Sequence, residues 1–378
     1  METLRYSALR LLALFMTIVF AEIALGAAQS RTNASARPCR VVNATQGKHF
    51  PPDSGAALAA AIESANPDDQ LEITGICTGT YRLSQNIDLT GISTKQFPIP
   101  TLDGGQAGST LTVASGVNAT LTDLTITNGM SGFGAGIANA GNLTLVACAV
   151  SGNRAFLRVG TGDGGGIANV GSLILRASLV SGNIAENEGG GIANFVRGIV
   201  TVTESSTVSG NLGGDFGGGI MNTGVLTIDA STVTGNRASL FAGGGIHNRG
   251  TLTVQNSSTI SDNDGRRDGG GILNMGGTVT VNSSTLSGNR GTGGGGAIHN
   301  RFGGIVILNS SRVSGNNSGL GGGIFNDNGT VTLNSSVVTG NTAVVTGGGI
   351  FNNAGAVNLN SSVVTANIPD NCVGVPGC

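Results

Sequence analysis

The hydrophobic positions of this chain recur in a repeat of about 26 residues. Nine times, a glycine-rich run is followed by Ile, a variable residue and Asn. From Asn222 onward the Asn residues of this motif lie 26 residues apart, whereas the earlier spacings are 30, 25 and 28. The differences fall in the segment before the glycines, which predicts a variable loop on one side of a regular stack. The nine pairs are Ile137/Asn139, Ile167/Asn169, Ile192/Asn194, Ile220/Asn222, Ile246/Asn248, Ile272/Asn274, Ile298/Asn300, Ile324/Asn326 and Ile350/Asn352.

Each repeat also contains two further segments with the pattern of a β-strand. After the Asn comes a short turn and an alternating segment, as at residues 226–228 and 331–333. A Ser-rich corner follows, and then a second segment that ends in Asn, as at residues 233–236 and 286–289. Period-two alternation with β-branched residues indicates strands. One repeat is therefore expected to form three short strands and three turns.

A single repeat cannot fold alone. Ordering each residue costs about 1–2 kcal/mol of backbone entropy, while burying each inward apolar side chain returns only about 1.5–3 kcal/mol. Stacked repeats gain main-chain hydrogen bonds to both neighbours, and their equivalent strands run parallel. Parallel crossovers are right-handed in the great majority of cases. The pattern thus predicts an all-β chain that forms a single right-handed parallel β-helix, a three-sided solenoid.

The recurring Asn residues predict ladders inside this stack. An Asn amide at a bend can bond to main-chain groups and to the equivalent Asn of the next coil. One structural ladder is expected from the Ile-x-Asn motif, including Asn194, Asn222, Asn248, Asn274, Asn300, Asn326 and Asn352. A second is expected from Asn153, Asn183, Asn211, Asn236, Asn263, Asn289, Asn316, Asn341 and Asn367.

Both ends of the chain differ from the repeats. Arg5 and Arg10 precede an apolar run at residues 11–20 and small residues near Gly26, which is the pattern of a signal peptide. No later stretch is long enough for a membrane helix. Residues 56–66 form the one apolar-faced helical segment after the signal, and they are placed to cap an open strand edge. The expected organisation is residues 1–26 as signal peptide, 27–69 as linker and capping helix, 70–368 as β-helix and 369–378 as C-terminal cap.

The composition of the chain limits the classes of partner and the cellular compartment that can be expected. The chain has 66 Gly among 378 residues, 11% charged residues and a net charge of -2, without a run of Lys or Arg. These features argue against a nucleic-acid partner. Five Cys in an exported chain predict disulfides. Cys372 is expected to pair with Cys378 and Cys39 with Cys77, while Cys148 stands where other repeats carry Ser and is expected to be a buried small residue.

Several motifs resemble a known group of proteins. Residues 58–62, 79–81 and 124–129, together with the repeated Gly-Gly-Gly-Ile-x-Asn, are similar to bacterial right-handed β-helix repeat proteins of the pectin-lyase-like fold. The Ser-Gly-Asn-x-Ala motif at residues 151–155 is similar to repeats of chlamydial polymorphic outer-membrane proteins. The resemblance covers residues 55–372. It implies the β-helix fold and suggests either adhesion or the cleavage of acidic polysaccharides.

The motifs of polysaccharide-cleaving enzymes are missing from the sequence. Galacturonan hydrolases of the fold carry a Gly-His-Gly, an Arg-x-Lys and several Asp on neighbouring coils, and pectate lyases carry a Ca²⁺ site of clustered carboxylates. The weak catalytic candidates here are Asp163, Glu188 and Asp268, each four residues before a repeat Ile. On adjacent coils, two such carboxylates could share a proton or a cation. The alternative is that they are solvated loop charges.

The middle residue of each Ile-x-Asn motif should point outward, because its neighbours point inward. The C-terminal half of this column is apolar and partly aromatic, which suggests an exposed ligand-binding stripe. The alternative is packing under the variable loops. Since His247 and His299 lie two coils apart without another His nearby, neither a zinc site nor a cofactor is expected. The candidate ligand-binding residues are Phe325, Phe351, His299, His247 and Leu273.

Two function classes follow from these patterns. The regular stack without an acid cluster favours an exported, non-catalytic scaffold that is secreted or held at the cell surface and binds a glycan or a surface component. The alternative is a polysaccharide lyase or hydrolase acting on an acidic polysaccharide. Arg197, Arg249 and Arg301 recur in the turn after the motif and would form a sparse basic column, suited either to an anionic glycan or to solubility. The oligomeric state is left open.

Overall fold

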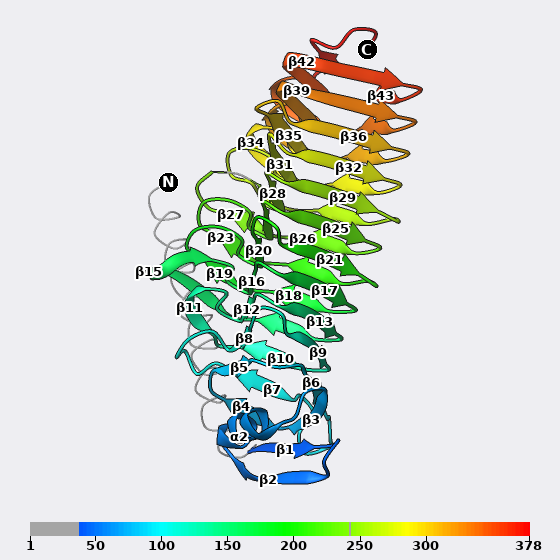
Figure 1. Ribbon diagram of the computed structural model, residues 1–378. Helices are drawn as coiled ribbons and strands as arrows, with labels where there is room; N and C mark the ends of the chain where they lie inside the picture. Colours follow the sequence, from blue (N-terminus) through cyan, green and yellow to red (C-terminus); the bar gives the residue numbers. More distant parts are fainter. Residues whose placement is uncertain (1–37, 242) are drawn as a thin grey trace, which may run out of the picture.

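The Ile-x-Asn motif forms a ladder of short parallel strands. The computed structural model describes residues 38–241 and 243–378, which stack into a parallel β-solenoid of about 11 turns (Figure 1). Along this ladder Ile lies opposite Ile and Asn opposite Asn from coil to coil. Its strands are β5 (Tyr81–Leu83), β8 (Leu111–Val113), β12 (Ile137–Asn139), β16 (Ile167–Asn169), β20 (Ile192–Asn194), β24 (Ile220–Asn222), β28 (Ile246–Asn248), β31 (Ile272–Met275), β35 (Ile298–Arg301), β39 (Ile324–Asn334) and β42 (Ile350–Asn360).

The alternating segment after the Asn forms a second parallel ladder, which belongs to the same 24-stranded sheet. In most of its strands the second and fourth residues are buried apolar side chains, whereas the alternate positions point outward and carry mostly polar residues, with exceptions such as the exposed Ile199 and Val225. Its strands are β3 (Asp69–Thr74), β6 (Ile87–Gly91), β9 (Asn118–Thr122), β13 (Asn142–Val146), β17 (Ser172–Arg176), β21 (Ile199–Thr203), β25 (Val225–Asp229), β29 (Thr251–Gln255), β32 (Thr278–Asn282) and β36 (Ile305–Asn309), followed by the second halves of β39 and β42.

The segment that ends in the second Asn forms a 12-stranded parallel sheet with one strand per coil. Its strands are β4 (Ile76–Thr78), β7 (Thr101–Asp103), β10 (Thr125–Thr127), β14 (Ala149–Ser151), β18 (Leu179–Ser181), β22 (Thr207–Ser209), β26 (Thr232–Thr234), β30 (Thr259–Ser261), β33 (Thr285–Ser287), β37 (Arg312–Ser314), β40 (Val337–Thr339) and β43 (Val363–Thr365).

The segment of variable length before the glycines carries two small parallel sheets of its own. The length differences between repeats are absorbed here, because strand lengths vary most in this segment and the pairing contains register shifts. The first sheet holds β11 (Met130–Phe133), β15 (Arg154–Asp163), β19 (Ile184–Ala185), β23 (Leu212–Gly213) and β27 (Arg237–Ala238). The second holds β34 (Arg290–Gly294), β38 (Asn317–Leu320) and β41 (Thr342–Thr346).

The two predicted sets of Asn residues form hydrogen-bonded ladders inside the stack. In the Ile-x-Asn set, each Nδ2 from Asn139 to Asn326 donates to the Oδ1 of the next coil, and Asn194, Asn222 and Asn248 do so at 2.8 Å. In the second set Asn211 and Asn236 donate in the same way at 2.9 and 3.0 Å. Every Asn also donates to main-chain carbonyls, so these buried amides are satisfied.

The glycine runs are required by close approach between coils. The first glycine of a run adopts a left-handed conformation, as at Gly243 with φ of 72°. A Cβ on the third glycine, Gly245, would lie 2.6 Å from the carbonyl oxygen of Gly271 on the next coil. Glycine is therefore favoured where the backbones of successive coils touch, although Ala297 occupies the equivalent of Gly245 in one coil.

The N-terminal end of the stack carries structure that the sequence did not predict. Within the expected linker, β1 (Cys39–Asn43) and β2 (Lys48–Asp53) form an antiparallel hairpin, and β1 pairs antiparallel with β3. The helix α2 (Ala56–Ser64) packs against β1, β2 and β5 and buries Leu58 and Ile62 (Figure 1). The expected helix at residues 56–66 is thus present, although it ends two residues early.

Both predicted disulfides are present. Cys39 is bonded to Cys77, and Cys372 of β44 (Cys372–Val373) is bonded to Cys378. Cys148 is a free thiol that is buried, as expected, and burial raises its pKa to about 11.

The expected signal peptide, residues 1–26, and the first part of the linker, residues 27–37, lie outside the described residues. Within 38–241 and 243–378, no helix is both long enough and apolar enough to cross a membrane.

Candidate functional site

Buried polar atoms without a hydrogen-bond partner lie on two coils of the solenoid that are separated by a single coil. Among the described residues these atoms are Nδ1 of His247, both ring nitrogens of His299, and Nε of Arg301. The three residues come from β28 and β35, which flank β31 in the Ile-x-Asn ladder. Because buried polar groups in proteins are nearly always paired, such a group is a sign of a bound ligand, an ion or ordered water. This region is therefore the candidate functional site.

The exposure that the sequence predicts for the candidate ligand-binding residues is wrong for three of them. His247, Leu273 and His299 are middle residues whose Ile and Asn neighbours point inward, so they project away from the core. Their exposed fractions are nevertheless only 0%, 1% and 2%. They do not form an open stripe on the surface.

The preceding coil covers these residues. The ring of Phe216 stacks on the imidazole of His247 with 4.5 Å between centroids, and Oδ1 of Asp268 lies 3.5 Å from Nδ1 of His299. Phe216 and Asp268 both stand four residues before the Ile of their own coil. This loop position therefore packs over the middle residue of the following coil. The arrangement corresponds to the second alternative from the sequence, in which the middle residues pack under the variable loops.

Phe325 and Phe351 are the two candidate ligand-binding residues that stay half-buried. They continue an aromatic column that begins at His299. The centroid distances are 4.6 Å from His299 to Phe325 and 5.3 Å from Phe325 to Phe351. The accessible part of the predicted stripe is thus confined to its C-terminal end.

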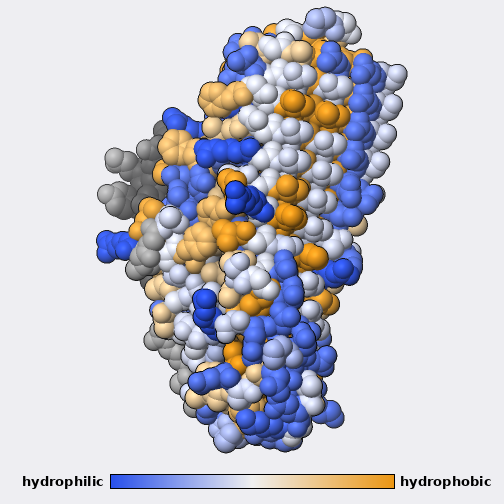
Figure 2. All heavy atoms as spheres, in the orientation of Figure 1, coloured by the Kyte–Doolittle hydropathy of each residue, from blue (hydrophilic) through white to orange (hydrophobic). Residues whose placement is uncertain are grey.

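A cavity of about 190 Å³ is lined by Arg301, which carries one of the unpartnered atoms, and by Asp268, the neighbour of His299. Figure 2 shows hydrophobic and strongly hydrophilic side chains lying next to each other on the flank of the solenoid where β23 and β27 are found in Figure 1. Polar and aromatic groups therefore converge on a single hollow. The cavity is lined by Phe216, Phe241, Arg267, Asp268, Leu273, Met275, Arg301 and Phe302.

Asp268 is the charged centre of this cavity. Its carboxylate lies 3.5 Å from Nδ1 of His299 and 3.9 Å from Nη1 of Arg301, and it accepts a hydrogen bond from the backbone amide of Gly294 at 3.1 Å. Burial alone would raise the pKa of Asp268, but His299, Arg301 and the Gly294 amide outweigh it, so the pKa is lowered. The carboxylate therefore stays ionised and can accept hydrogen bonds from a ligand.

Aromatic rings and guanidinium groups form the walls. Phe216 and Phe241 stack with 5.1 Å between centroids, and the guanidinium of Arg249 lies 5.7 Å from the Phe216 ring. The guanidinium of Arg301 lies 4.4 Å from the ring of Phe302. Two members of the predicted basic column, Arg249 and Arg301, thus reach the same site from coils that are two apart.

Asp163 and Glu188 occupy matching positions on adjacent coils, away from Asp268. Oδ1 of Asp163 accepts hydrogen bonds from Nδ2 of Asn187 at 2.8 Å and from the backbone amide of Glu188 at 3.0 Å. Burial is the main cause that raises the pKa of Asp163, and burial likewise raises the pKa of Glu188. Asp163 is only 6% exposed, so it is not a solvated loop charge. Its bonds tie one loop to the next.

Replacing Asp163 by Asn should stabilise the fold at neutral pH. A raised pKa means that the folded state disfavours the ionised carboxylate, so stability falls as pH rises from the ordinary Asp value through the raised one. Asn keeps the accepting oxygen without the charge. We expect Asp163→Asn to melt at a higher temperature than the wild type at pH 7, with the gain lost near pH 4, about the ordinary pKa of Asp. Equal melting temperatures at pH 7 would show that the buried charge carries no such cost.

The sequence did not single out the aromatic walls of the cavity. Phe241 and Phe302 lie in segments without a repeat pattern. Met275 follows the Asn of its motif, where the sequence predicts a turn, whereas in the structure it is the last residue of β31. One signal was present for Phe216, because it stands at the same position before the repeat Ile as Asp163, Glu188 and Asp268. If the residues at this recurring position are taken together as one column, Phe216 falls in the site.

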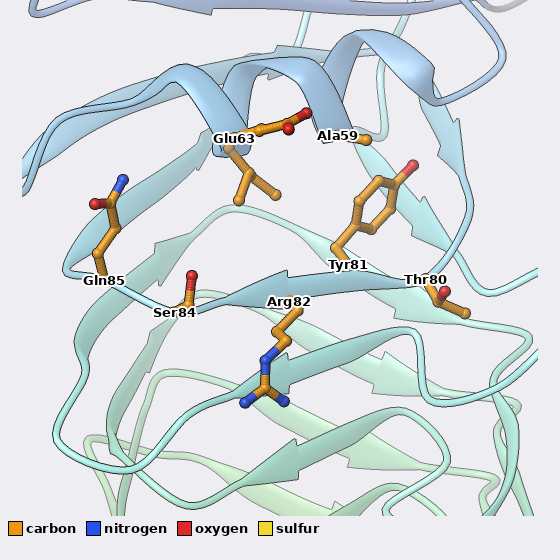
Figure 3. A pocket seen from close by; sticks show the side chains of 8 residues that line it. Ala59, Glu63, Thr80, Tyr81, Arg82, Ser84 and Gln85 are labelled. Carbon is orange, nitrogen blue, oxygen red and sulfur yellow. The ribbon is translucent and has the colours of Figure 1, made fainter.

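A second hollow, of about 350 Å³, lies under α2 at the N-terminal end (Figure 3). Tyr81 and Gln85 point toward the helix, whereas Arg82 points away from it. The Tyr81 hydroxyl donates to the carbonyl of Gly55 at 3.4 Å, and Nε2 of Gln85 donates to the carbonyl of Ala65 at 2.6 Å. These partnered groups hold the helix on the first coils and do not indicate a ligand.

The described part of the chain contains no group of three or more His, Cys, Asp or Glu residues placed to hold a metal ion. In comparisons with known proteins, no family model, no curated protein and no solved structure matches this chain.

Proposed function

We propose that this chain is an exported, non-catalytic scaffold that binds a glycan in the cavity around Asp268 and Arg301. The observation that carries the proposal is the unpartnered Nε of Arg301 on the wall of an aromatic-lined cavity, next to the carboxylate of Asp268. A bound hydroxyl group would supply the missing partner for such atoms.

The chemistry of the walls suits a sugar ring. The C–H faces of sugars pack on aromatic rings such as those of Phe216 and Phe241. Sugar hydroxyls both donate and accept, so they can accept from Arg301 and donate to the ionised Asp268. The cavity volume of about 190 Å³ suits one ring of a longer chain that continues along the flank.

The finer features of the fold are part of the same proposal. We infer a right-handed coil with three faces, because parallel crossovers strongly prefer that hand. The helix α2 would act as an N-terminal cap that covers the first strand edges. The similarity of the repeats to pectin-lyase-like and chlamydial outer-membrane repeats supports this architecture and a role in adhesion. The two disulfides support an oxidising compartment, at the cell surface or outside the cell.

Binding should be lost when the cavity is altered and kept when a distant Arg is altered. On a glycan array, we expect the full chain to bind at least one of the immobilised glycans. Arg301→Gln and Phe241→Ala should each weaken that binding about tenfold, because a charged hydrogen bond is worth about 1.5–3 kcal/mol and a ring contact about as much. Phe241 is 41% exposed, so its removal should leave the fold intact.

Arg312→Gln is the matched control, since Arg312 is exposed on β37 in a different sheet. It should bind like the wild type in a surface-plasmon-resonance titration with the glycan that binds on the array. Equal affinity for Phe241→Ala and the wild type, or an array without any bound glycan, would contradict the proposal.

The second candidate function is cleavage of an acidic polysaccharide. The observation that favours it is the ionised Asp268 beside His299, a pair able to exchange a proton with a substrate. The two functions can be separated by incubating the protein with a set of acidic polysaccharides. Cleavage is monitored as an increase in ultraviolet absorbance and as the release of reducing ends. Activity that disappears in Asp163→Ala or Asp268→Asn would replace the scaffold proposal with an enzyme.

A further inference from the structure

Met221, His247 and Met275 lie on three consecutive coils, and each carries a thioether or imidazole donor. Met221 lies directly opposite His247 in the strand register, and Nε2 of His247 lies 3.2 Å from Sδ of Met275 on the following coil. Met221 is 2% exposed and His247 is 0% exposed. The chain has only five Met residues, and two of them stand beside the same imidazole.

The surroundings of this cluster are dry and aromatic. The Phe216 ring covers the imidazole of His247, and Nδ1 of His247 has no hydrogen-bond partner. The imidazole of His247 is fully buried, and its Nε2 faces the sulfur of Met275. Met275 is half-buried and lines the cavity, which connects its sulfur with solvent.

We propose that Met221, His247 and Met275 form a binding site for a soft monovalent metal ion, Cu(I) or Ag(I). Thioether sulfur and neutral imidazole are donors that such ions prefer, whereas Mg²⁺ and Ca²⁺ require oxygen ligands. Methionine side chains are flexible enough for the two sulfurs to close on an ion beside the fixed imidazole. This site stands on residues other than Asp268, His299 and Arg301, so it does not depend on the proposed glycan binding.

The test uses Ag(I), which needs no reductant, and the full chain carrying Cys148→Ser. That background removes a second soft ligand at little structural cost, because the neighbouring coils carry Ser178 and Ser206 at this position. Isothermal titration with silver nitrate should show one equivalent bound. The chain has three His residues, and in ¹⁵N-histidine NMR spectra only the signals of His247 should shift.

The variants separate metal binding from folding. Met275→Leu keeps the side-chain volume, and His247→Leu introduces the residue that the next coil carries as Leu273. Both should retain the wild-type urea midpoint and lose at least tenfold in Ag(I) affinity. Met130→Leu, on a distant coil, should bind like the parent. Arg249→Gln removes a neighbouring positive charge without touching a donor and should tighten binding.

Unchanged affinity in Met275→Leu would overturn the proposal, as would a shift confined to His49 or His299. Weaker binding in Arg249→Gln would also count against a cation at this position.

Discussion

Asn248→Asp should destabilise the solenoid by about 3–5 kcal/mol, the cost of an unpaired buried charge. Nδ2 of Asn248 donates to Oδ1 of Asn274 at 2.8 Å and to the carbonyls of Gly250 and Thr278 at 3.1 and 3.3 Å. A carboxylate oxygen in its place would face three acceptors without a proton to offer. The midpoint of urea unfolding, followed by far-ultraviolet circular dichroism, measures the loss at pH 7.

Asn360→Asp is the matched control for this substitution. Asn360 belongs to a surface ladder, is exposed, and donates to Oδ1 of Asn334 at 2.8 Å. The same chemical change there should cost within about 0.5 kcal/mol, because water solvates the new carboxylate. Lowering the pH should restore part of the stability of Asn248→Asp, since a protonated Asp can donate one hydrogen bond. Similar losses at both positions would show that burial of the ladder is not the cause.

The buried ladders were predictable because they depend on identity from repeat to repeat. An Ile at a fixed position can be buried, and an Asn two residues later can complete its hydrogen bonds, only against the equivalent residues of the coils above and below. The register of Ile246 on Ile272 and of Asn248 on Asn274 follows directly. The disulfides were predictable from position, because Cys39 and Cys77 flank the first coils and Cys372 lies close to Cys378 in sequence.

The cover over the middle residues was not predictable from period two. Alternation shows that His247 points away from the core, but it does not show what lies above it. The cover comes from Phe216, in a loop whose length varies among repeats and whose path is defined by contacts with the neighbouring coil. The same limit applies to Met275, which approaches His247 from the end of β31, where the sequence predicted a turn. Sites built across coils by irregular segments therefore require the structure.

The loop position four residues before the repeat Ile contacts the middle residue of the next coil, and at Gly294 this contact limits the size of the loop residue. Phe216 and Asp268 cover His247 and His299 at this position, whereas the larger Phe325 is preceded by Gly294. A Cβ added to Gly294 would overlap the Phe325 ring. That ring cannot move aside easily, since it is stacked between His299 and Phe351.

Gly294→Ala should therefore cost about 2–3 kcal/mol through overpacking. The φ of Gly294 lies outside the left-handed region, so the backbone itself tolerates Ala. In the background of Phe325→Ala the same substitution should cost less than about 0.5 kcal/mol, which gives a coupling free energy of about 2 kcal/mol between the two positions. Urea unfolding of the wild type, both single variants and the double variant completes the cycle. If Gly294→Ala costs the same in both backgrounds, then the overlap is relieved by the backbone, and the loop does not sense the residue beneath it.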